Sequence, residues 1–190
     1  MPRIPPATQA LLWVNFGAYL LSALAGGALF DDLALWPVGD GFEPWQLVTY
    51  SFLHEGLPHI ALNMFALYMF GSDVERVWGA KRFLTYYFTC VVSAALTQLL
   101  FLWWTGDLFP TVGASGGVFG LLLAFALLFP HRRIILIIPP IPMPAWLFVT
   151  LYGVIELVQG VTGTAAGVAH FAHLGGMLGG WLLLQYSRRR

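Results

Sequence analysis

Long apolar segments separated by short polar connections make up most of the chain. Six segments can be distinguished, and most approach the roughly 20 residues that a helix needs to cross about 30 Å of hydrocarbon. They run from Leu11 to Phe30, Leu57 to Gly71, Phe83 to Trp104, Ser115 to Phe129, Trp146 to Val161 and Val168 to Tyr186. The pattern predicts an all-α polytopic membrane bundle of six transmembrane helices, forming a single domain over residues 1–190.

The composition supports this interpretation and limits the chemistry. Hydrophobic residues make up 58% of the chain, charged residues only 9%, and the mean hydropathy is +0.75, which excludes an ordinary soluble domain. The single Cys90 lies in the third segment, where we expect a packed structural thiol. With dispersed histidines and no clustered carboxylates, we expect no metal and no other cofactor, and His54 with His59 leave only a small chance of a metal site.

The cationic residues are segregated between alternate connections. All nine fall on one side of the predicted topology: Arg3, Arg76, Lys81, Arg82, Arg132, Arg133, Arg188, Arg189 and Arg190. Because Lys and Arg are retained on the cytoplasmic side of a membrane, we expect both termini to be cytoplasmic. Contact with the lipid headgroups of the bilayer accounts for these charges, so no nucleic acid partner is expected.

A serine and a histidine stand at the start of two apolar segments. Ser115 lies in a Gly-Ala-Ser-Gly-Gly motif at residues 113–117, and His173 lies in an Ala-His-Leu-Gly-Gly motif at residues 172–176. Polar groups within a bilayer are costly and usually have a function. Counted from Arg132 and Arg188, the two residues lie about 25 and 23 Å along their helices at roughly 1.5 Å per residue, so we expect them at similar depths.

Two further polar residues reach the same level. His59 and Asn63 are four residues apart on one helix face, at a comparable distance from Arg76. A serine nucleophile needs a base, for which His173 is suited, and its tetrahedral intermediate needs donors, for which His59, Asn63 and the Ser115 backbone amide are suited. The fourth segment is only about 15 residues, or roughly 22 Å, so Ser115 is expected in a recess open to the outside.

The base has no evident acidic partner in the sequence. On spacing, only Asp107 and Glu156 are candidates for a third member, and neither is convincing, so the sequence predicts a Ser-His dyad. Phe119, one turn after Ser115, either stacks on the imidazole or is ordinary core, and we favour core.

The glycines near Ser115 and His173 have an alternative explanation. Gly116 with Gly120, and Gly176 with Gly180, form small-xxx-small pairs that permit close helix contact without any catalysis. Both explanations require the fourth and sixth segments to pack closely.

At these residues the chain resembles the rhomboid family of intramembrane serine proteases, in its minimal six-helix form. The resemblance covers nearly the whole chain: Trp45 and the array of His54, His59 and Asn63, then Glu75 with Gly79, the serine motif at residues 113–116, and Ala172 and His173 followed by Gly175, Gly176 and Gly179. It implies that Ser115 is the nucleophile, His173 the general base, and His59, Asn63 and the Ser115 amide the oxyanion site.

The resemblance also carries expectations for residues outside the chemistry. It implies that His54 is structural and holds the first loop by hydrogen bonds. Gln46 departs from the family pattern, because many relatives have Arg at this position, which leaves the anchoring of the loop open. His170 is an extra histidine, expected either to tune the base or to lie in the outer mouth.

The implied reaction is hydrolysis of a peptide bond in a transmembrane protein substrate, near the outer membrane interface. The substrate segment would enter laterally, and the fifth span, with Glu156 and Gln159 toward its outer end, is a candidate gate. A bacterial inner membrane is expected from the compact form.

Two rival functions remain open from the sequence. One is an inactive rhomboid-like protein for binding or quality control, which the presence of both Ser115 and His173 argues against. The other is a transporter, which the gathering of polar groups in the outer half of the membrane argues against.

Overall fold

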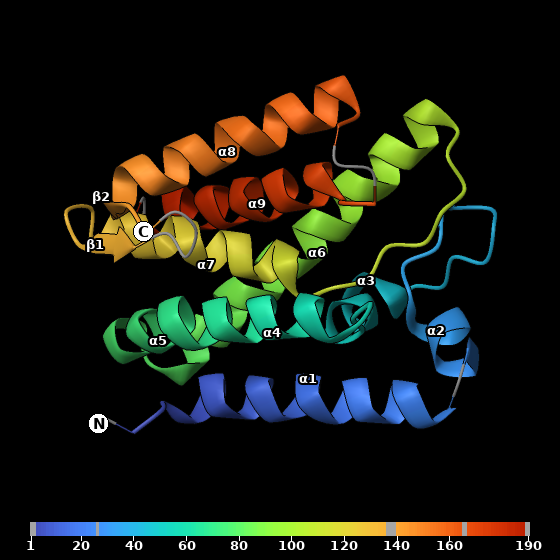
Figure 1. The fold of residues 1–190 in the computed structure, drawn as a ribbon, viewed down its shortest axis with the longest axis horizontal. Helices are drawn as coiled ribbons and strands as arrows, with labels where there is room; N and C mark the ends of the chain where they lie inside the picture. The colour runs from blue at the N-terminus through green and yellow to red at the C-terminus, as the bar shows by residue number, and fades with distance from the viewer. Residues whose placement is uncertain (1–2, 26, 136–139, 165–166, 189–190) are drawn as a thin grey trace.

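The structure is a computed structural model and describes residues 3–25, 27–135, 140–164 and 167–188. It is an all-α membrane bundle (Figure 1), as the sequence predicts. The helices are α1 (Pro6–Ala25), α2 (Gly27–Leu33), α3 (Gln46–Thr49), α4 (Leu57–Ala66), α5 (Ser72–Trp78), α6 (Ala80–Thr105), α7 (Ser115–Leu128), α8 (Ala145–Thr162) and α9 (His170–Arg188), with a 3-10 turn η1 (Tyr50–Phe52) and a π-helical segment η2 (Leu67–Gly71). A small antiparallel hairpin pairs β1 (Arg133–Ile135) with β2 (Pro142–Pro144).

The helices match the predicted spans in position but differ clearly at three boundaries. The first span begins at Pro6 instead of Leu11, and α1 ends at Ala25 instead of the predicted Phe30. The second continues through α4, η2 and α5 to Trp78, beyond the predicted end at Gly71, and stops where Gly79 adopts a φ of +75°. Hydropathy marks only the part of a helix that lies in hydrocarbon. The helix itself continues until a residue interrupts its backbone conformation.

Length and hydropathy distinguish the helices. Among the described residues, α1, α6 and α8 are long and apolar enough to cross a membrane, whereas α7 is a shorter apolar helix of 14 residues. It begins well inside the bundle, short of the ends of α6 and α8 (Figure 1). The fourth span is therefore short, as its sequence predicts, and its first residue, Ser115, lies below the end of the bundle.

Glycines allow α6, α7 and α9 to pack in close contact. A Cβ added to Gly176 on α9 would overlap the backbone oxygen of Gly116 on α7, and one added to Gly120 would overlap the sulfur of Cys90 on α6. The pairs Gly116 with Gly120 and Gly176 with Gly180 therefore do permit close helix contact. Cys90 is fully buried in this contact, as expected for a packed thiol.

The start of α1 is held by a buried carboxylate from α5. Glu75 Oε1 accepts a hydrogen bond from the Ala7 amide at 2.9 Å, and Oε2 accepts from the Thr8 amide at 2.6 Å and the Thr8 hydroxyl at 2.7 Å. The first amides of a helix have no intrahelical acceptor and carry a partial positive charge, so a carboxylate is a favourable partner. This explains why α1 begins several residues before its apolar segment.

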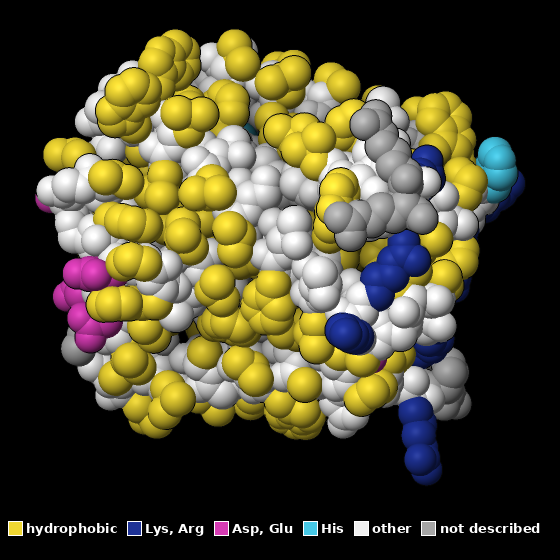
Figure 2. All heavy atoms as spheres, turned by 180° about the vertical axis from the view of Figure 1, so that it is seen from behind, with side chains coloured by type: hydrophobic (Ala, Val, Ile, Leu, Met, Phe, Trp, Pro, Cys, Tyr) yellow, Lys and Arg dark blue, Asp and Glu magenta, His cyan; other side chains and the backbone are white. Residues whose placement is uncertain are grey.

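Charge is distributed along the bundle in the way a membrane protein requires. Figure 2 shows Lys and Arg side chains at one end and Asp and Glu side chains at the other, with a wide hydrophobic surface between them. At the cationic end, the Asp73 carboxylate forms ion pairs with two guanidinium groups, at 2.8 Å from Oδ1 to Arg76 Nη1 and 2.7 Å from Oδ2 to Arg132 Nη1. The start of α1 and the end of α9 lie at this same end of the bundle (Figure 1).

Candidate active site

The side chains of Ser115 and His173 meet in the middle of the bundle. Ser115 is the first residue of α7 and His173 is in the first turn of α9, and the distance between Ser115 Oγ and His173 Nε2 is 2.7 Å. The contact of Gly116 with Gly176, one and three residues further along these helices, brings the two backbones close enough for this hydrogen bond. The structure thus brings together the two residues that the depth argument paired.

A carboxylate that the sequence analysis set aside lies on the other side of the imidazole. Glu156 Oε2 is 2.8 Å from His173 Nδ1, and both side chains are buried. This corrects the expectation that no acidic group accompanies the base. Spacing could not identify the pair, because the rotation of α8 about its own axis decides where Glu156 points. The signal in the sequence was the ionisable residue itself, which is costly within an apolar helix.

The same carboxylate oxygen contacts a second histidine. His170 Nδ1 is 2.7 Å from Glu156 Oε2, and its Nε2 is 3.2 Å from the Thr164 carbonyl oxygen. His170 therefore lies beside the base and is buried. The ligand atoms of Glu156, His170 and His173 lie within 4.8 Å of one another, a group that could hold a metal ion, and it differs from the His54 and His59 pair considered from the sequence.

The predicted oxyanion residues approach Ser115 from α4. A point at the Cβ position of Gly113, whose φ is +124°, would lie 2.8 Å from His59 Nε2 and 3.7 Å from Ser115 Oγ, so both groups lie close to Gly113. The Glu55 amide donates to His59 Nδ1 at 3.3 Å, which leaves the proton of a neutral ring on Nε2. Asn63 is buried, and its Nδ2 donates to the His59 carbonyl at 3.0 Å.

These groups share one cavity. Its volume is about 1250 Å³, and its polar lining includes Ser115, His173, His59, Asn63 and Glu156. An apolar continuation runs between η2 and α8, where Met69, Phe70, Phe148 and Tyr152 line it. The recess predicted for Ser115 is thus present as a cavity that joins a polar group of residues to an apolar channel.

The sequence of the chain is similar to that of known proteins. The model of the Rhomboid domain matches residues 41–190. The chain belongs to the rhomboid family. It is similar to Rhomboid protein 1, mitochondrial, of Saccharomyces cerevisiae (32% identity over 146 residues, 72% of this chain and 40% of that protein) and to Rhomboid protease GluP of Bacillus subtilis (29% over 140 residues, 73% and 25%). The match thus spans less than half of either relative.

A third relative matches over most of its length. The chain is 29% identical to the Putative rhomboid protease YdcA of Bacillus subtilis over 180 residues, which cover 93% of this chain and 83% of that protein. The rhomboid family comprises intramembrane serine proteases together with inactive members. Membership and the apolar helices establish an integral multi-pass membrane protein with a protease or rhomboid-like function.

Within this rhomboid, Phe119 covers the face of the proposed base. Its ring stacks on the His173 imidazole with 4.2 Å between centroids and 6° between planes. Phe119 is also a buried core residue, so the two alternatives considered for it from the sequence both hold. The one-turn spacing from Ser115 had allowed this contact, but only the close approach of α9 to α7 decides it.

The loop-holding role expected for His54 stays a prediction. Both of its ring nitrogens are buried without a close, well-aligned hydrogen-bond partner among the described residues, although the Phe52 backbone in the first loop acts on the ring as a hydrogen-bonding group. Burial, and secondly the neighbouring His59, lower the pKa of His54 to about 4, which keeps the ring neutral at pH 7. It packs edge-on against His59, with 5.0 Å between ring centroids.

Gln46 anchors the first loop of this rhomboid. Its Oε1 accepts from the Trp36 amide at 3.1 Å, and its Nε2 donates to the carbonyls of Gly41 at 3.2 Å and Asp32 at 3.4 Å. Gln46 is almost completely buried. A neutral amide, which both donates and accepts, thus holds the loop where the family pattern has a cation.

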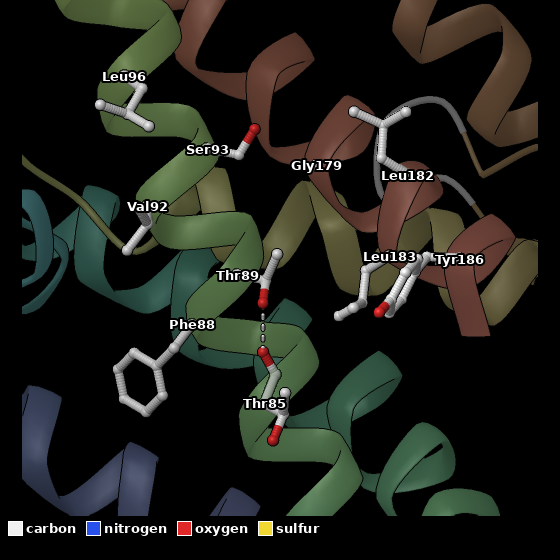
Figure 3. Close-up of a pocket in the computed structure, with 10 residues that line it drawn as sticks. All are labelled: Thr85, Phe88, Thr89, Val92, Ser93, Leu96, Gly179, Leu182, Leu183 and Tyr186. Carbon is white, nitrogen blue, oxygen red and sulfur yellow. Dashed lines mark hydrogen bonds between the residues drawn. The ribbon is translucent and has the colours of Figure 1, made fainter. Parts of the chain in front are cut away.

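A second hollow, of about 750 Å³, lies between α6 and α9 (Figure 3). It is lined by Thr85, Phe88, Thr89, Val92, Ser93, Leu96, Gly179, Leu182, Leu183 and Tyr186. Its α6 hydroxyls donate to backbone carbonyls: Thr85 to Lys81, Thr89 to Thr85, and Ser93 to Gly175. None of these lining residues is a histidine, a cysteine, a carboxylate or a cation.

Proposed function

We propose that this rhomboid is an intramembrane serine endopeptidase that cleaves transmembrane segments of membrane proteins near the outer interface. The observation that carries the proposal is the 2.7 Å contact between Ser115 Oγ and His173 Nε2. The contact lies in a cavity that also holds the two oxyanion candidates, His59 and Asn63. Ser115 is the nucleophile and His173 the general base.

Acylation begins when Ser115 Oγ attacks the substrate carbonyl carbon and its proton passes to His173 Nε2. The carbonyl oxygen becomes an oxyanion, for which three donors are available: the Ser115 amide at the start of α7, His59 Nε2–H, and the second hydrogen of Asn63 Nδ2, whose first is donated to the His59 carbonyl. The C–N bond then breaks, and His173 returns the proton to the leaving amine. A water molecule, deprotonated by His173, hydrolyses the acyl-enzyme and restores Ser115.

The shape of the cavity supports lateral entry of the substrate. Its apolar part extends between η2 and α8, where a transmembrane segment can leave lipid and approach Ser115. The reaction centre itself is narrow, because glycines bring α7 and α9 into backbone contact beside it. We therefore expect small side chains next to the scissile bond of a transmembrane protein substrate.

A cleavage and labelling experiment tests this function. Purified protein in detergent is incubated with a tagged single-span substrate that carries small residues near its outer end, with and without prior treatment with a fluorophosphonate. We expect cleavage by untreated protein, loss of cleavage after treatment, and the phosphonyl adduct on the peptide that contains Ser115. Cleavage that survives complete modification of Ser115 would contradict the proposal, and absence of both cleavage and labelling in folded protein would favour an inactive rhomboid.

We also propose that one domain spans residues 1–190 and that both termini are cytoplasmic. The segregation of cations at the end of the bundle where α1 starts and α9 stops supports this orientation (Figures 1 and 2). In bacterial spheroplasts, epitope tags at either terminus should resist external protease until the membrane is permeabilised. Digestion of either tag in intact spheroplasts would contradict the cytoplasmic location of that terminus. The bacterial inner membrane stays a prediction, because the relatives are both bacterial and mitochondrial.

A further inference from the structure

We propose that Glu156 is a positioning residue for the base, so that this rhomboid works with a Ser-His-Glu arrangement. The inference rests on the proposed roles of Ser115 and His173. Its geometric basis is a single line of contacts: Ser115 Oγ to His173 Nε2 at 2.7 Å, and His173 Nδ1 to Glu156 Oε2 at 2.8 Å.

The position of Glu156 in α8 points to a role beyond packing. The buried residues of this 18-residue helix are Ala145, Val149 and Glu156, so Glu156 is its one buried ionisable residue. A carboxylate taken out of water is costly unless its charge is matched by hydrogen-bond donors. Here the carboxylate contacts two imidazoles, and one of them belongs to the proposed base.

The carboxylate selects the tautomer that the reaction needs. A carboxylate accepts but does not donate, so His173 Nδ1 carries the proton that faces Glu156 Oε2. In a neutral ring this leaves Nε2 unprotonated and able to accept the Ser115 Oγ–H. With the opposite tautomer, Nε2 would hold a proton and could not act as a base toward Ser115.

The same contact favours the transition state over the ground state. When the Ser115 proton moves to His173 Nε2, the ring becomes an imidazolium, while the proton on Nδ1 stays in place and faces the ionised Glu156. Attraction between the new positive charge and the carboxylate exists only after proton transfer, so it contributes to catalysis and not to substrate binding. The low dielectric of a buried site strengthens it.

His170 provides an internal control for this role. It contacts the same Glu156 Oε2 at 2.7 Å, yet its ring stands about perpendicular to that of His173, with 6.4 Å between centroids. Its other ring nitrogen contacts the Thr164 carbonyl, whereas that of His173 contacts Ser115. If Glu156 served only to fasten α8 to α9, loss of either histidine contact would have similar effects. If Glu156 orients the base, loss of its contact with His173 lowers the reaction rate much more than loss of its contact with His170.

A consequence concerns the helix that carries the carboxylate. Ser115 and His173 lie on α7 and α9, which are locked together by backbone contact at Gly116 and Gly176. Glu156 lies on α8, which buries few residues and borders the apolar channel. The tautomer of the base therefore depends on the position of α8.

The test compares Glu156→Gln, Glu156→Asp and His170→Gln with wild type in the full-length protein. Three quantities are measured: kcat and KM on the tagged single-span substrate, the rate of Ser115 phosphonylation by a fluorophosphonate, and the apparent Tm. We expect Glu156→Gln to lower kcat and the phosphonylation rate by about 10²-fold or more with KM changed little, Glu156→Asp to recover about tenfold, and His170→Gln to lose about threefold at most.

Two results would overturn the inference while leaving the proposed function intact. One is a Glu156→Gln protein that keeps at least half of the wild-type phosphonylation rate. The other is a loss of rate and a fall in Tm in His170→Gln that equal those in Glu156→Gln. Glu156 would then serve only as a structural contact between α8 and α9. Wild-type protein that is not labelled at Ser115 would instead remove the proposed function and this inference with it.

Discussion

Alanine at Ser115 is expected to lower kcat/KM for the tagged single-span substrate by about 10⁴-fold or more, and alanine at His173 by nearly as much. The reason is that the two side chains act as one unit through the 2.7 Å hydrogen bond: without His173 the hydroxyl keeps its proton, and without Ser115 the base has no nucleophile to activate. The effects should therefore not add. The Ser115→Ala, His173→Ala double variant should be no slower than the slower single variant, within about threefold.

Steady-state cleavage by the four proteins of this cycle provides the measurement, with the apparent Tm of each as a check on folding. Additive losses in the double variant would show that the two residues act independently and would contradict the mechanism. Asn63→Ala serves as a contrast, because one oxyanion donor of several is removed. We expect it to lose roughly 10²-fold, much less than either member of the pair.

Alanine at Gly176 is expected to lower both the cleavage rate and the stability, although Gly176 has no part in the chemistry. Its added Cβ would overlap the backbone oxygen of Gly116, and a backbone atom cannot be displaced by a rotamer change. Helices α7 and α9 must then separate, which lengthens the Ser115 to His173 contact. A displacement of about 1 Å between two reacting groups lowers the rate roughly 10²-fold. The overpacking also lowers the free energy of unfolding by about 1–3 kcal/mol, which corresponds to a fall in Tm of roughly 3–10 °C.

Gly17→Ala is the matched control for Gly176→Ala. Gly17 is also within a helix, but a Cβ at this position meets no atom within 4 Å among the described residues. Cleavage rate and apparent Tm are measured for both variants. Wild-type cleavage and stability in Gly176→Ala would show that the two helices tolerate separation and that glycine contact does not set the geometry of the pair.

The features that could be predicted from the sequence are those that a bilayer imposes on contiguous residues. Apolar length located the starts of the helices near Leu57, Phe83, Ser115 and Trp146 to within three residues, because backbone groups in hydrocarbon must be satisfied within each helix. The cations measured depth along each helix, and so placed Ser115 and His173 at one level. The resemblance to rhomboids added the family, which the match over residues 41–190 confirms.

What the sequence alone could not give is the rotation of each helix and the neighbour that it faces. The sequence indicates how far along α8 Glu156 lies. It does not indicate that Glu156 points at His173, or that the Phe119 ring stacks on the imidazole with 4.2 Å between centroids. The hydrogen bond that the Thr8 amide donates to Glu75 joins residues 67 positions apart, and no local pattern encodes it. These contacts depend on which helices can approach, and here the glycines of α7 and α9 decide it. Hydrophobic pattern is a property of one helix, whereas a site of three side chains from three helices exists only once their packing is fixed.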